Sequence, residues 1–363
     1  MRLHPITGIS AQAFTVPTDH PESDGTLEWQ ATTIVIVRIH AGGRMGIGYT
    51  YAHACLVELI QATLAPLLLG QDCFAIADCR QRLLAAVRNL GVSGLSAMAI
   101  SACDIALWDL KGQLLGLPLV AMLGACREAC PIYGSGGFTS YDDARLAAQL
   151  GGWAEAGLTM VKMKVGREAG RDRHRVQVAR TAIGPEVSLF VDANGAYQPA
   201  QAVALALEFA TLAVRWFEEP VPSLDARRMH WVRTRLPAGM DLAGGEYQFS
   251  LADAQRLLDA QAVDVLQADV TRCLGISGFL ETAALCAARG IELSAHCAPA
   301  VHLHLGCALP AVRHLEWFHD HVRIESLFFE GAPAPVAGQV RPDPNRPGLG
   351  LVLKEPDMAR YAA

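Results

Sequence analysis

The chain has 363 residues, of which 52% belong to the hydrophobic class and 18% are charged. This composition excludes long disordered tracts and suffices for one large domain plus a smaller one. The formal net charge of -6 provides no basic stripe, so nucleic acid is not expected as a partner. A small anionic ligand would need local positive charge from a metal ion or a few lysines.

The ten cysteines do not form the pattern of a secreted disulfide scaffold. Most lie within apolar segments of a long chain, whereas such scaffolds gather their cysteines in short, loop-rich chains. Cys126 and Cys130 are close in sequence, but no second pair completes a zinc site with them. The N-terminal residues lack the apolar run of a signal peptide, and no run of about 18 apolar residues predicts a membrane span. We therefore expect reduced thiols, no membrane partner and a cytoplasmic protein.

The first third of the chain predicts strands followed by helices. The β-branched run 31–40 and the run 45–51 are separated by a glycine turn and predict two paired strands. Gly46 and Gly48 precede no helix start within a βαβ unit, so they do not predict a dinucleotide site. Helices are expected over roughly 53–69, 74–89 and 93–115.

From about Pro131 onward, short apolar runs alternate with longer amphipathic segments. Strands are expected at 131–133, 160–165, 187–191, 214–217, 240–243, 263–266, 291–293 and 312–315. Helices are expected between them, including 144–156, 173–183, 199–211 and 251–261. Eight strands alternating with helices favour a closed parallel barrel over an open sheet. The segment after about Ser326 is rich in proline and glycine and predicts no further βα unit.

Polar residues recur at the carboxyl ends of these strands, where the active sites of such barrels lie. In chain order they are Lys162, Lys164, Asp192, Asn194, Glu218, Glu246, Asp269, His296 and Glu316. From Lys164 onward they recur about once per βα unit, an interval that isolated charged residues have no reason to keep. The recurrence therefore predicts one shared polar mouth.

Three of these residues, Asp192, Glu218 and Glu246, are carboxylates on consecutive strands. Left unpaired they would repel one another, so a hard cation such as Mg²⁺ is their natural counter-ion. Separate surface carboxylates are the alternative, which fits one residue better than a phased trio. Lys162 and Lys164 point to the same side of their strand, and two adjacent ammonium groups would favour Lys164 as a base. A solvated lysine pair is the alternative there.

His296 follows an apolar run, and Asp269 lies one unit earlier. A carboxylate hydrogen-bonded to an imidazole fixes its tautomer and makes the other ring nitrogen a better base. A lone buried histidine is more often structural, but an acidic residue at the same position of the preceding strand favours a functional role. Tyr133 and Ser135, at the end of the first barrel strand, could line the same pocket.

Together these motifs resemble the enolase superfamily and, within it, the mandelate racemase subgroup. The matching segments are 161–164, 192–195, 217–220 and 244–246, together with Asp269, His296 and Glu316. The segment 101–112 is similar to the helix that ends the family's capping domain, and 347–350 is similar to its C-terminal signature. The resemblance covers essentially the whole chain, and the motifs are specific in combination only.

The resemblance implies a modified (β/α)7β barrel of the TIM type with an N-terminal α+β capping domain. The implied divisions are residues 1–125 for the cap, 126–325 for the barrel and 326–363 for a tail that packs back on the cap. A homo-oligomer is also implied.

The resemblance further implies a role for each strand-end residue. The positions that match the family's Mg²⁺ ligands are Asp192, Glu218 and Glu246. Lys164 matches the base on one face of the substrate, and His296 paired with Asp269 matches the base on the other. Lys162 matches the partner of the catalytic lysine, and Glu316 matches the group that hydrogen-bonds the substrate carboxylate.

The implied chemistry is removal of the proton next to a substrate carboxylate, through an enediolate that Mg²⁺ stabilises. Reprotonation on the opposite face gives racemisation or epimerisation, whereas loss of a β-hydroxyl with help from His296 gives a 2-keto acid. In this family the loop at 18–30 covers the site, and here it carries His20, Glu22, Asp24 and Glu28. A polar lid favours a polyhydroxy substrate, hence dehydration of a sugar acid to a 2-keto-3-deoxy acid, although these side chains could simply face water.

Three alternatives stay open. They are a racemase or epimerase, a cycloisomerase that acts on a lactone with the same metal and bases, and a metal-binding barrel without activity. The last is disfavoured because no base or ligand position is missing. The further expected substrate contacts are Asn194, Tyr133, Ser135 and His20.

Overall fold

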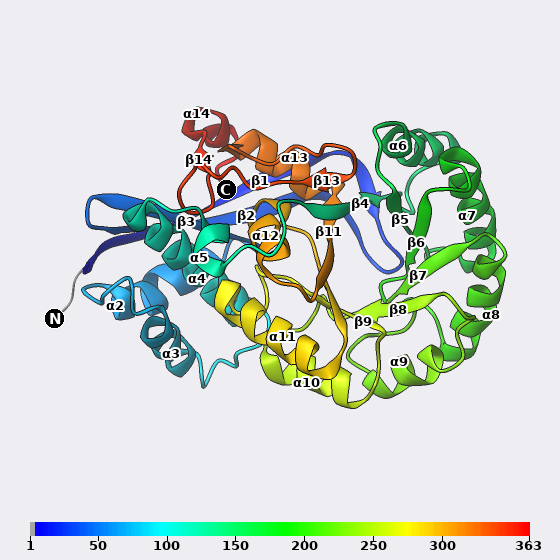
Figure 1. The fold of residues 1–363 in the computed structure, drawn as a ribbon, viewed down its shortest axis with the longest axis horizontal. Coiled ribbons are helices and arrows are strands. Elements are labelled where there is room, and N and C mark those ends of the chain that lie inside the picture. Colours follow the sequence, from blue (N-terminus) through cyan, green and yellow to red (C-terminus); the bar gives the residue numbers. More distant parts are fainter. Residues whose placement is uncertain (1–3) are drawn as a thin grey trace.

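A computed structural model describes residues 4–363 and places a cap of strands and helices beside a barrel (Figure 1). The cap holds an antiparallel sheet of β1 (Ile6–Ser23), β2 (Glu28–Ala41) and β3 (Arg44–Tyr51). Its helices are α1 (Leu56–Glu58), the π-helix η1 (Leu59–Leu64), α2 (Ala65–Leu68), α3 (Ile76–Ala86), α4 (Leu95–Leu115) and α5 (Leu119–Leu123). The N-terminal segment, which lacks the apolar run of a signal peptide, begins with residues 1–3, and these lie outside the described residues. Between residues 4 and 363, no helix is long and apolar enough to cross a bilayer.

The barrel confirms the expected (β/α)7β architecture. Its parallel strands are β4 (Cys130–Gly136), β5 (Met160–Lys164), β6 (Ser188–Asp192), β7 (Val214–Glu218), β8 (Asp241–Gly244), β9 (Val265–Ala268), β10 (Glu292–Ala295) and β11 (Val312–Phe318). The helices between them are α6 (Asp143–Glu155), α7 (Ala169–Ile183), α8 (Pro199–Ala210), α9 (Ala226–Arg233), α10 (Leu251–Asp259), α11 (Gly275–Arg289) and α12 (Pro299–Ala308). Pairing of β11 with β4 closes the barrel.

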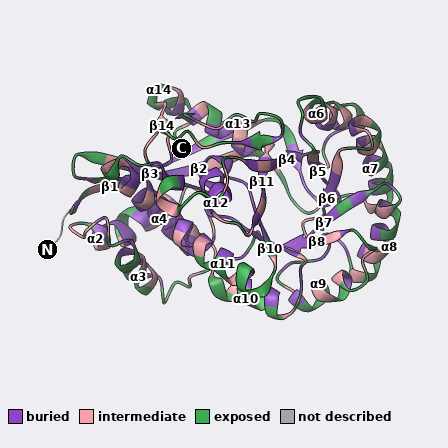
Figure 2. Ribbon diagram, in the orientation of Figure 1, coloured by how far each residue is buried: buried purple, intermediate pink, exposed green. Residues whose placement is uncertain are grey.

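Local sequence explains where several barrel helices begin. The side chains of Asp142, Asp225 and Ser250 accept backbone N–H groups in the first turns of α6, α9 and α10. Pro199 and Pro299 begin α8 and α12, a position that does not need the missing N–H. The strands are almost continuously buried, as expected for parallel strands covered on both faces, and exposure lies on the outward faces of the helices (Figure 2).

Large aromatic side chains fill the barrel interior below its carboxyl mouth. Tyr133, Phe190 and Trp216 pack there with two small neighbours, and the rings of Phe190 and Trp216 stack with centroids 5.2 Å apart. This packed floor leaves space for a ligand only above it, between the strand ends and the cap.

The sheet of the cap packs closely on the long helix α4, and α4 in turn contacts the C-terminal tail. A Cβ added at Gly48 of β3 would lie 2.0 Å from Ala102 O of α4, so glycine permits this approach. Asp109 of α4 accepts hydrogen bonds from Ile47 N and from Leu349 N of the tail, both at 2.7 Å. This buried carboxylate therefore ties together the two segments that resemble family signatures.

The tail returns to the cap after α13 (His319–Phe328). Its elements are β12 (Phe329–Glu330), β13 (Gln339–Val340), β14 (Val352–Leu353), α14 (Glu355–Met358) and the 3₁₀-helix η2 (Ala359–Tyr361). Ala363 N donates to Ala13 O of β1 at 3.1 Å. The division of the chain at residues 125 and 325 stays a prediction.

The expectation of a loop over residues 18–30 is wrong for most of that segment. β1 continues to Ser23 and β2 begins at Glu28, so only a short tip lies between them. The ladder resumes at Glu22 opposite Trp29 after an irregularity that begins at Pro17. The loop was implied by the family resemblance, whereas backbone pairing, which does not depend on side-chain polarity, extends both strands through the polar segment.

The hairpin tip, residues 24–27, rests on the carboxyl ends of β5 and β6 (Figure 1). Asp24 Oδ1 closes the tip by accepting Thr26 N and Leu27 N at 2.6 and 2.7 Å. A Cβ on Gly25 would lie 2.3 Å from Ala193 O and 2.8 Å from another barrel carbonyl. Both carbonyls belong to residues that directly follow strand-end site residues, so the position of the tip is set by backbone contact.

We predict that Gly25→Ala lifts the tip from the barrel, because backbone carbonyls cannot move aside as a flexible side chain can. Hydrogen exchange of the amides in 22–30 should become faster. Gly152→Ala is the control. An added Cβ at Gly152 of α6 would have no neighbour within 4 Å, so exchange of the amides in 22–30 should stay unchanged. Equal exchange in Gly25→Ala and the parent would contradict the tight docking.

Candidate active site

The strand-end residues predicted from the sequence converge at the carboxyl mouth of the barrel. Lys164, Asp192 and Glu218 are the last residues of β5, β6 and β7 and lie in one register across the three strands. Glu246, Asp269 and His296 follow β8, β9 and β10 within two residues, and Glu316 lies in β11. All of these side chains are buried.

Three carboxylates form a site that fits a hard divalent cation. One oxygen each of Asp192, Glu218 and Glu246 lies within 4.8 Å of the others. Glu246 Oε2 makes no well-oriented hydrogen bond with any described residue, although His296 Nε2 lies 3.2 Å away. Burial, and next the charge of Asp192, raise the pKa of Glu218 to about 8. Glu218 therefore lacks a full counter-charge, and the oxygen donors of the trio suit Mg²⁺.

Two lysines provide the cations closest to this trio. Lys162 Nζ lies 2.5 Å from Glu218 Oε1 and 2.9 Å from Glu316 Oε1, and Lys164 Nζ lies 2.5 Å from Asp192 Oδ2. Burial alone lowers the pKa of Lys164, but the charges of Asp192, Glu246 and Glu218 together outweigh burial and raise that pKa. The charge of Lys162 lowers the pKa of Lys164, as expected from the sequence, but by less than the charge of Asp192 raises it.

His296 and Asp269 form the predicted dyad. His296 Nδ1 lies 2.9 Å from Asp269 Oδ2, while Thr271 N and Oγ1 each donate to Asp269 Oδ1 at 2.7 Å. A donated Nδ1–H fixes the tautomer and directs Nε2 into the site. Burial alone lowers the pKa of His296, but the negative charges around it, Glu246 among them, outweigh burial and raise that pKa.

Glu316 is held from two sides. Ser135 Oγ donates to Glu316 Oε1 at 2.6 Å, and Cys297 N donates to Glu316 Oε2 at 3.0 Å. Ser135 is fully buried, so it orients Glu316 and does not face the cavity.

The other expected substrate contacts lie in different places. Asn194 lines the cavity, whereas Tyr133, Ser135 and His20 do not. Tyr133 belongs to the packed floor of the barrel. His20 is exposed on β1, with its ring edge-on to Tyr141.

A cavity of about 710 Å³ lies between the barrel mouth and the cap. Its further lining residues, which the sequence did not reveal, include Leu27, Trp29, Thr32, Thr33, Tyr51, His53, Tyr247, Arg272, Cys297, Phe318 and His321. Arg272 follows Asp269 by three residues, and Cys297 directly follows His296, so the strand-end rule could have found both. Of the cap residues, Leu27 and Trp29 lie in the segment 18–30 that the family resemblance placed over the site, whereas the others come from segments without such a signal.

Comparison with known proteins identifies the family. Residues 9–124 match the mandelate racemase / muconate lactonizing enzyme N-terminal domain, and residues 144–357 match the enolase C-terminal domain-like family. The chain belongs to the enolase superfamily, in its mandelate racemase subgroup.

Three related proteins show how similar the chain is to known proteins in sequence and in structure. The crystal structure of a mandelate racemase/muconate lactonizing enzyme-like protein from Rubrobacter xylanophilus aligns with a TM-score of 0.97 and 50% identity, covering 99% of this chain and 100% of that one. A racemase from Streptomyces coelicolor with bound magnesium aligns with a TM-score of 0.93 and 28% identity, covering 99% and 100%. L-talarate/galactarate dehydratase from Salmonella typhimurium is 34% identical over 297 residues, which are 79% of this chain and 74% of that protein.

In this member of the mandelate racemase subgroup, the hairpin over residues 18–30, here called the lid hairpin, buries two of its acidic residues. Glu22 and Asp24 are buried, whereas His20 and Glu28 face solvent, so the polar lid predicted from the sequence is only partly solvated. Trp29 Nε1 donates to Glu22 Oε2 at 2.8 Å. The other oxygen of Glu22 has no hydrogen-bond partner among the described residues.

Burial is the main cause that raises the pKa of Glu22 to about 8. The nearby Asp320 and Asp19 raise it further, while the hydrogen bond from Trp29 and the charge of Arg323 lower it. The folded hairpin therefore favours a protonated Glu22.

We predict that Glu22→Gln removes a pH-dependent loss of stability. The pKa of Glu22 is 4.5 in the unfolded chain and about 8 in the folded protein. Between these two pH values the carboxyl group takes up a proton on folding, so the stability of the parent falls as pH rises through this window. The melting temperature of Glu22→Gln minus that of the parent should grow from about pH 5 to about pH 8. Glu28→Gln, exposed in the same hairpin, is the control, and a difference that does not change with pH would contradict the account.

Proposed function

We propose that the protein dehydrates a sugar acid to a 2-keto-3-deoxy acid, by removing the proton next to the carboxylate. The observation that carries this proposal is one cavity lined by Lys164 and His296, which transfer protons, beside three carboxylates that fit Mg²⁺. Relatives in the family are named as acid-sugar dehydratases, cycloisomerases and a racemase.

Asp192, Glu218 and Glu246 are the residues that would hold Mg²⁺. When bound, the ion stabilises the negative charge that develops on a carboxylate as its neighbouring proton is lost. Related structures carry magnesium with L-glucarate or with mandelic acid, which supports a small carboxylate as the ligand.

The chain's own residues carry the proton transfers. Lys164 Nζ accepts the α-proton as the bond between the α-carbon and its hydrogen breaks, which requires the neutral amine that would form once Asp192 no longer holds the ammonium charge. His296 Nε2–H, oriented by Asp269, gives its proton to the β-hydroxyl, which leaves as water when the carbon to oxygen bond breaks. The enol that remains becomes the 2-keto acid. Lys162 compensates the neighbouring carboxylates, and Glu316, which lines the cavity at the end of β11, is the residue proposed to contact the substrate carboxylate.

The composition of the cavity wall supports a polyhydroxy substrate. Asn194 offers an amide whose oxygen has no partner among the described residues, Arg272 and His53 offer nitrogen atoms, and the Thr32 hydroxyl, which donates to Asp320, can still accept a hydrogen bond. These groups suit hydroxyls along a sugar chain, as in the talarate and galactarate of the Salmonella relative's name.

A racemase is the second candidate, favoured by two apolar lid residues. Leu27 and Trp29 line the same cavity and would suit an apolar substrate, like the mandelic acid bound to one related structure.

A library of sugar acids and non-sugar acids distinguishes the two candidates. We expect semicarbazide-reactive 2-keto product from at least one sugar acid in the presence of Mg²⁺. In ²H₂O, a racemase would instead place deuterium on the α-carbon of both enantiomers and release no hydroxyl. Exchange with a non-sugar acid, combined with no keto product from any sugar acid, would contradict dehydration.

We predict that Glu218→Gln abolishes turnover and weakens Mg²⁺ binding, because it removes one negative ligand from the trio. Calorimetric titration with Mg²⁺ and product assays would measure the two effects. Glu208→Gln, on the exposed face of α8, is the control and should behave as the parent. Full activity of the parent in excess EDTA would contradict the metal assignment.

We predict that Asp269 and His296 act as one unit in turnover. Asp269→Asn and His296→Asn should each lower kcat by about 10²–10⁴-fold, the range for positioned proton transfer, and the double variant should lose little more. Steady-state kinetics of the three variants would decide this. Losses that multiply in the double variant would show that the two residues work separately.

A further inference from the structure

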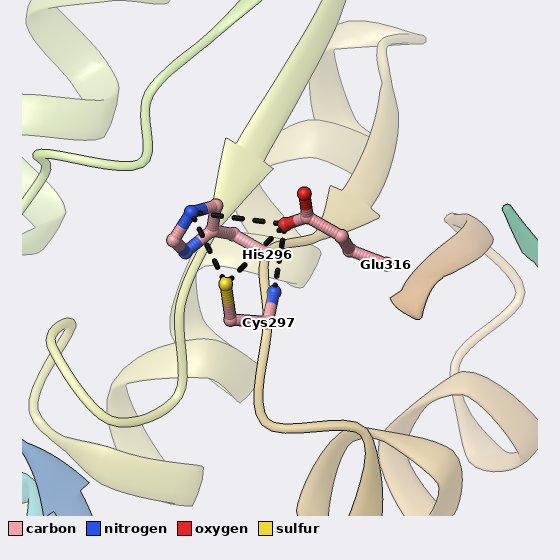
Figure 3. A group of neighbouring side chains, drawn as sticks. All are labelled: His296, Cys297 and Glu316. Carbon is pink, nitrogen blue, oxygen red and sulfur yellow. Dashed lines mark hydrogen bonds and ion pairs between the residues drawn. The ribbon is translucent and has the colours of Figure 1, made fainter. Parts of the chain in front are cut away.

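Three donor atoms of different kinds converge on one wall of the cavity (Figure 3). They are His296 Nε2, Cys297 Sγ and Glu316 Oε2. The sulfur lies 3.4 Å from the nitrogen and 3.5 Å from the oxygen, and the nitrogen lies 3.7 Å from the oxygen. All three side chains are buried, and all three line the cavity.

These separations are close to those between the ligands of a tetrahedral zinc ion. Bonds of about 2.3 Å to sulfur and about 2.0–2.2 Å to nitrogen and oxygen place neighbouring ligand atoms about 3.3–3.6 Å apart. An ion could therefore enter this cluster with only small side-chain shifts.

The backbone after β10 brings the thiol to this position. Side chains of consecutive residues in a strand point to opposite faces, so Cys297 would face away from His296 if the strand continued. The strand ends at Ala295, and Cys297 and Ala298 adopt left-handed φ values of 54° and 39°. Two successive non-glycine residues in this region are uncommon and concentrate at functional sites.

Neighbouring groups already orient the ligands as in known metal sites. Asp269 accepts a hydrogen bond from Nδ1 of His296 at 2.9 Å, which directs the Nε2 lone pair toward an ion. Cys297 N donates to the Glu316 oxygen that belongs to the cluster. The cavity leaves space for a fourth ligand, a water molecule or a substrate oxygen.

We propose that His296, Cys297 and Glu316 bind a thiophilic divalent cation, Zn²⁺, at a site separate from the three carboxylates that fit Mg²⁺. The thiolate selects Zn²⁺ over Mg²⁺, which prefers oxygen ligands only. Binding displaces the protons of the thiol and of Nε2, because both atoms must offer a lone pair.

Zinc at this site withdraws His296 from proton transfer. This consequence rests on the proposed function, whereas the binding itself does not. The thiol thereby makes the site sensitive to thiophilic metals, a property that a serine or glycine at position 297 would lack.

The test titrates Zn²⁺ into the protein held in saturating Mg²⁺, so that the carboxylate trio is already filled. Competition against a chromogenic zinc indicator should give one ion per chain in the parent. Cys297→Ala should weaken this binding by at least about 100-fold, more than loss of an outer-shell group costs. Cys286→Ala, a buried thiol outside the cavity, and Cys55→Ala, an exposed thiol, should retain it.

X-ray absorption of the zinc-loaded parent tests the ligand set without any variant and without a substrate. One sulfur and two or three nitrogen or oxygen ligands are expected. A zinc shell without sulfur, or unchanged affinity in a folded Cys297→Ala, would overturn the proposal. Loss of turnover does not enter either readout, so a wrong reaction assignment and a wrong zinc site give different results.

Discussion

Negative charge is concentrated in the buried mouth of the barrel, and the surrounding residues are arranged to compensate it. The buried carboxylates there are Asp192, Glu218, Glu219, Glu246, Asp269 and Glu316, and the cationic side chains in contact with them include Lys162, Lys164 and Arg272. Unpaired buried carboxylates are costly, and burial together with the charge of Asp192 raises the pKa of Glu218. In the proposed function, a divalent cation held by Asp192, Glu218 and Glu246 would supply the missing positive charge.

The cap completes this site by excluding solvent and supplying part of the cavity wall. Thr50 Oγ1 donates to Thr271 O beside Asp269 at 2.8 Å, and Asp104 of α4 accepts Ser277 N and Oγ of α11 at 2.9 and 2.7 Å. Gly25 brings the hairpin tip against the strand ends. Because charges interact more strongly where water is excluded, the groups proposed to transfer protons depend on a cap that is fixed to the barrel at several points.

Much of the fold and of the site could be predicted from the sequence, because a barrel repeats one unit and returns each strand end to the same mouth. This rule located Lys164, Asp192 and His296 without any knowledge of contacts. Ser135 shows where the rule stops, since its strand position was right but its hydroxyl serves Glu316. Tyr133, two residues earlier, belongs to the barrel floor.

The remaining features depend on geometry that residue patterns do not encode. The segment 18–30, which the family resemblance implied to be a loop, is mostly a hairpin that pairs through its backbone. Cys297 reaches the site through two left-handed residues, and a cysteine count indicated only reduced, buried thiols. The cavity residues of the cap, such as Thr32 and His53, are far in sequence from the barrel and meet it only in the folded chain.

A crystal structure of the protein grown with Mg²⁺ tests the central claim most directly. The account predicts one ion bound by oxygens of Asp192, Glu218 and Glu246 at about 2.0–2.1 Å, the range typical of Mg²⁺. It also predicts that Lys164 Nζ separates from Asp192 as the ion takes over the compensation of its charge. An ion bound elsewhere, or a trio that remains paired only with Lys162 and Lys164 at saturating Mg²⁺, would contradict the account.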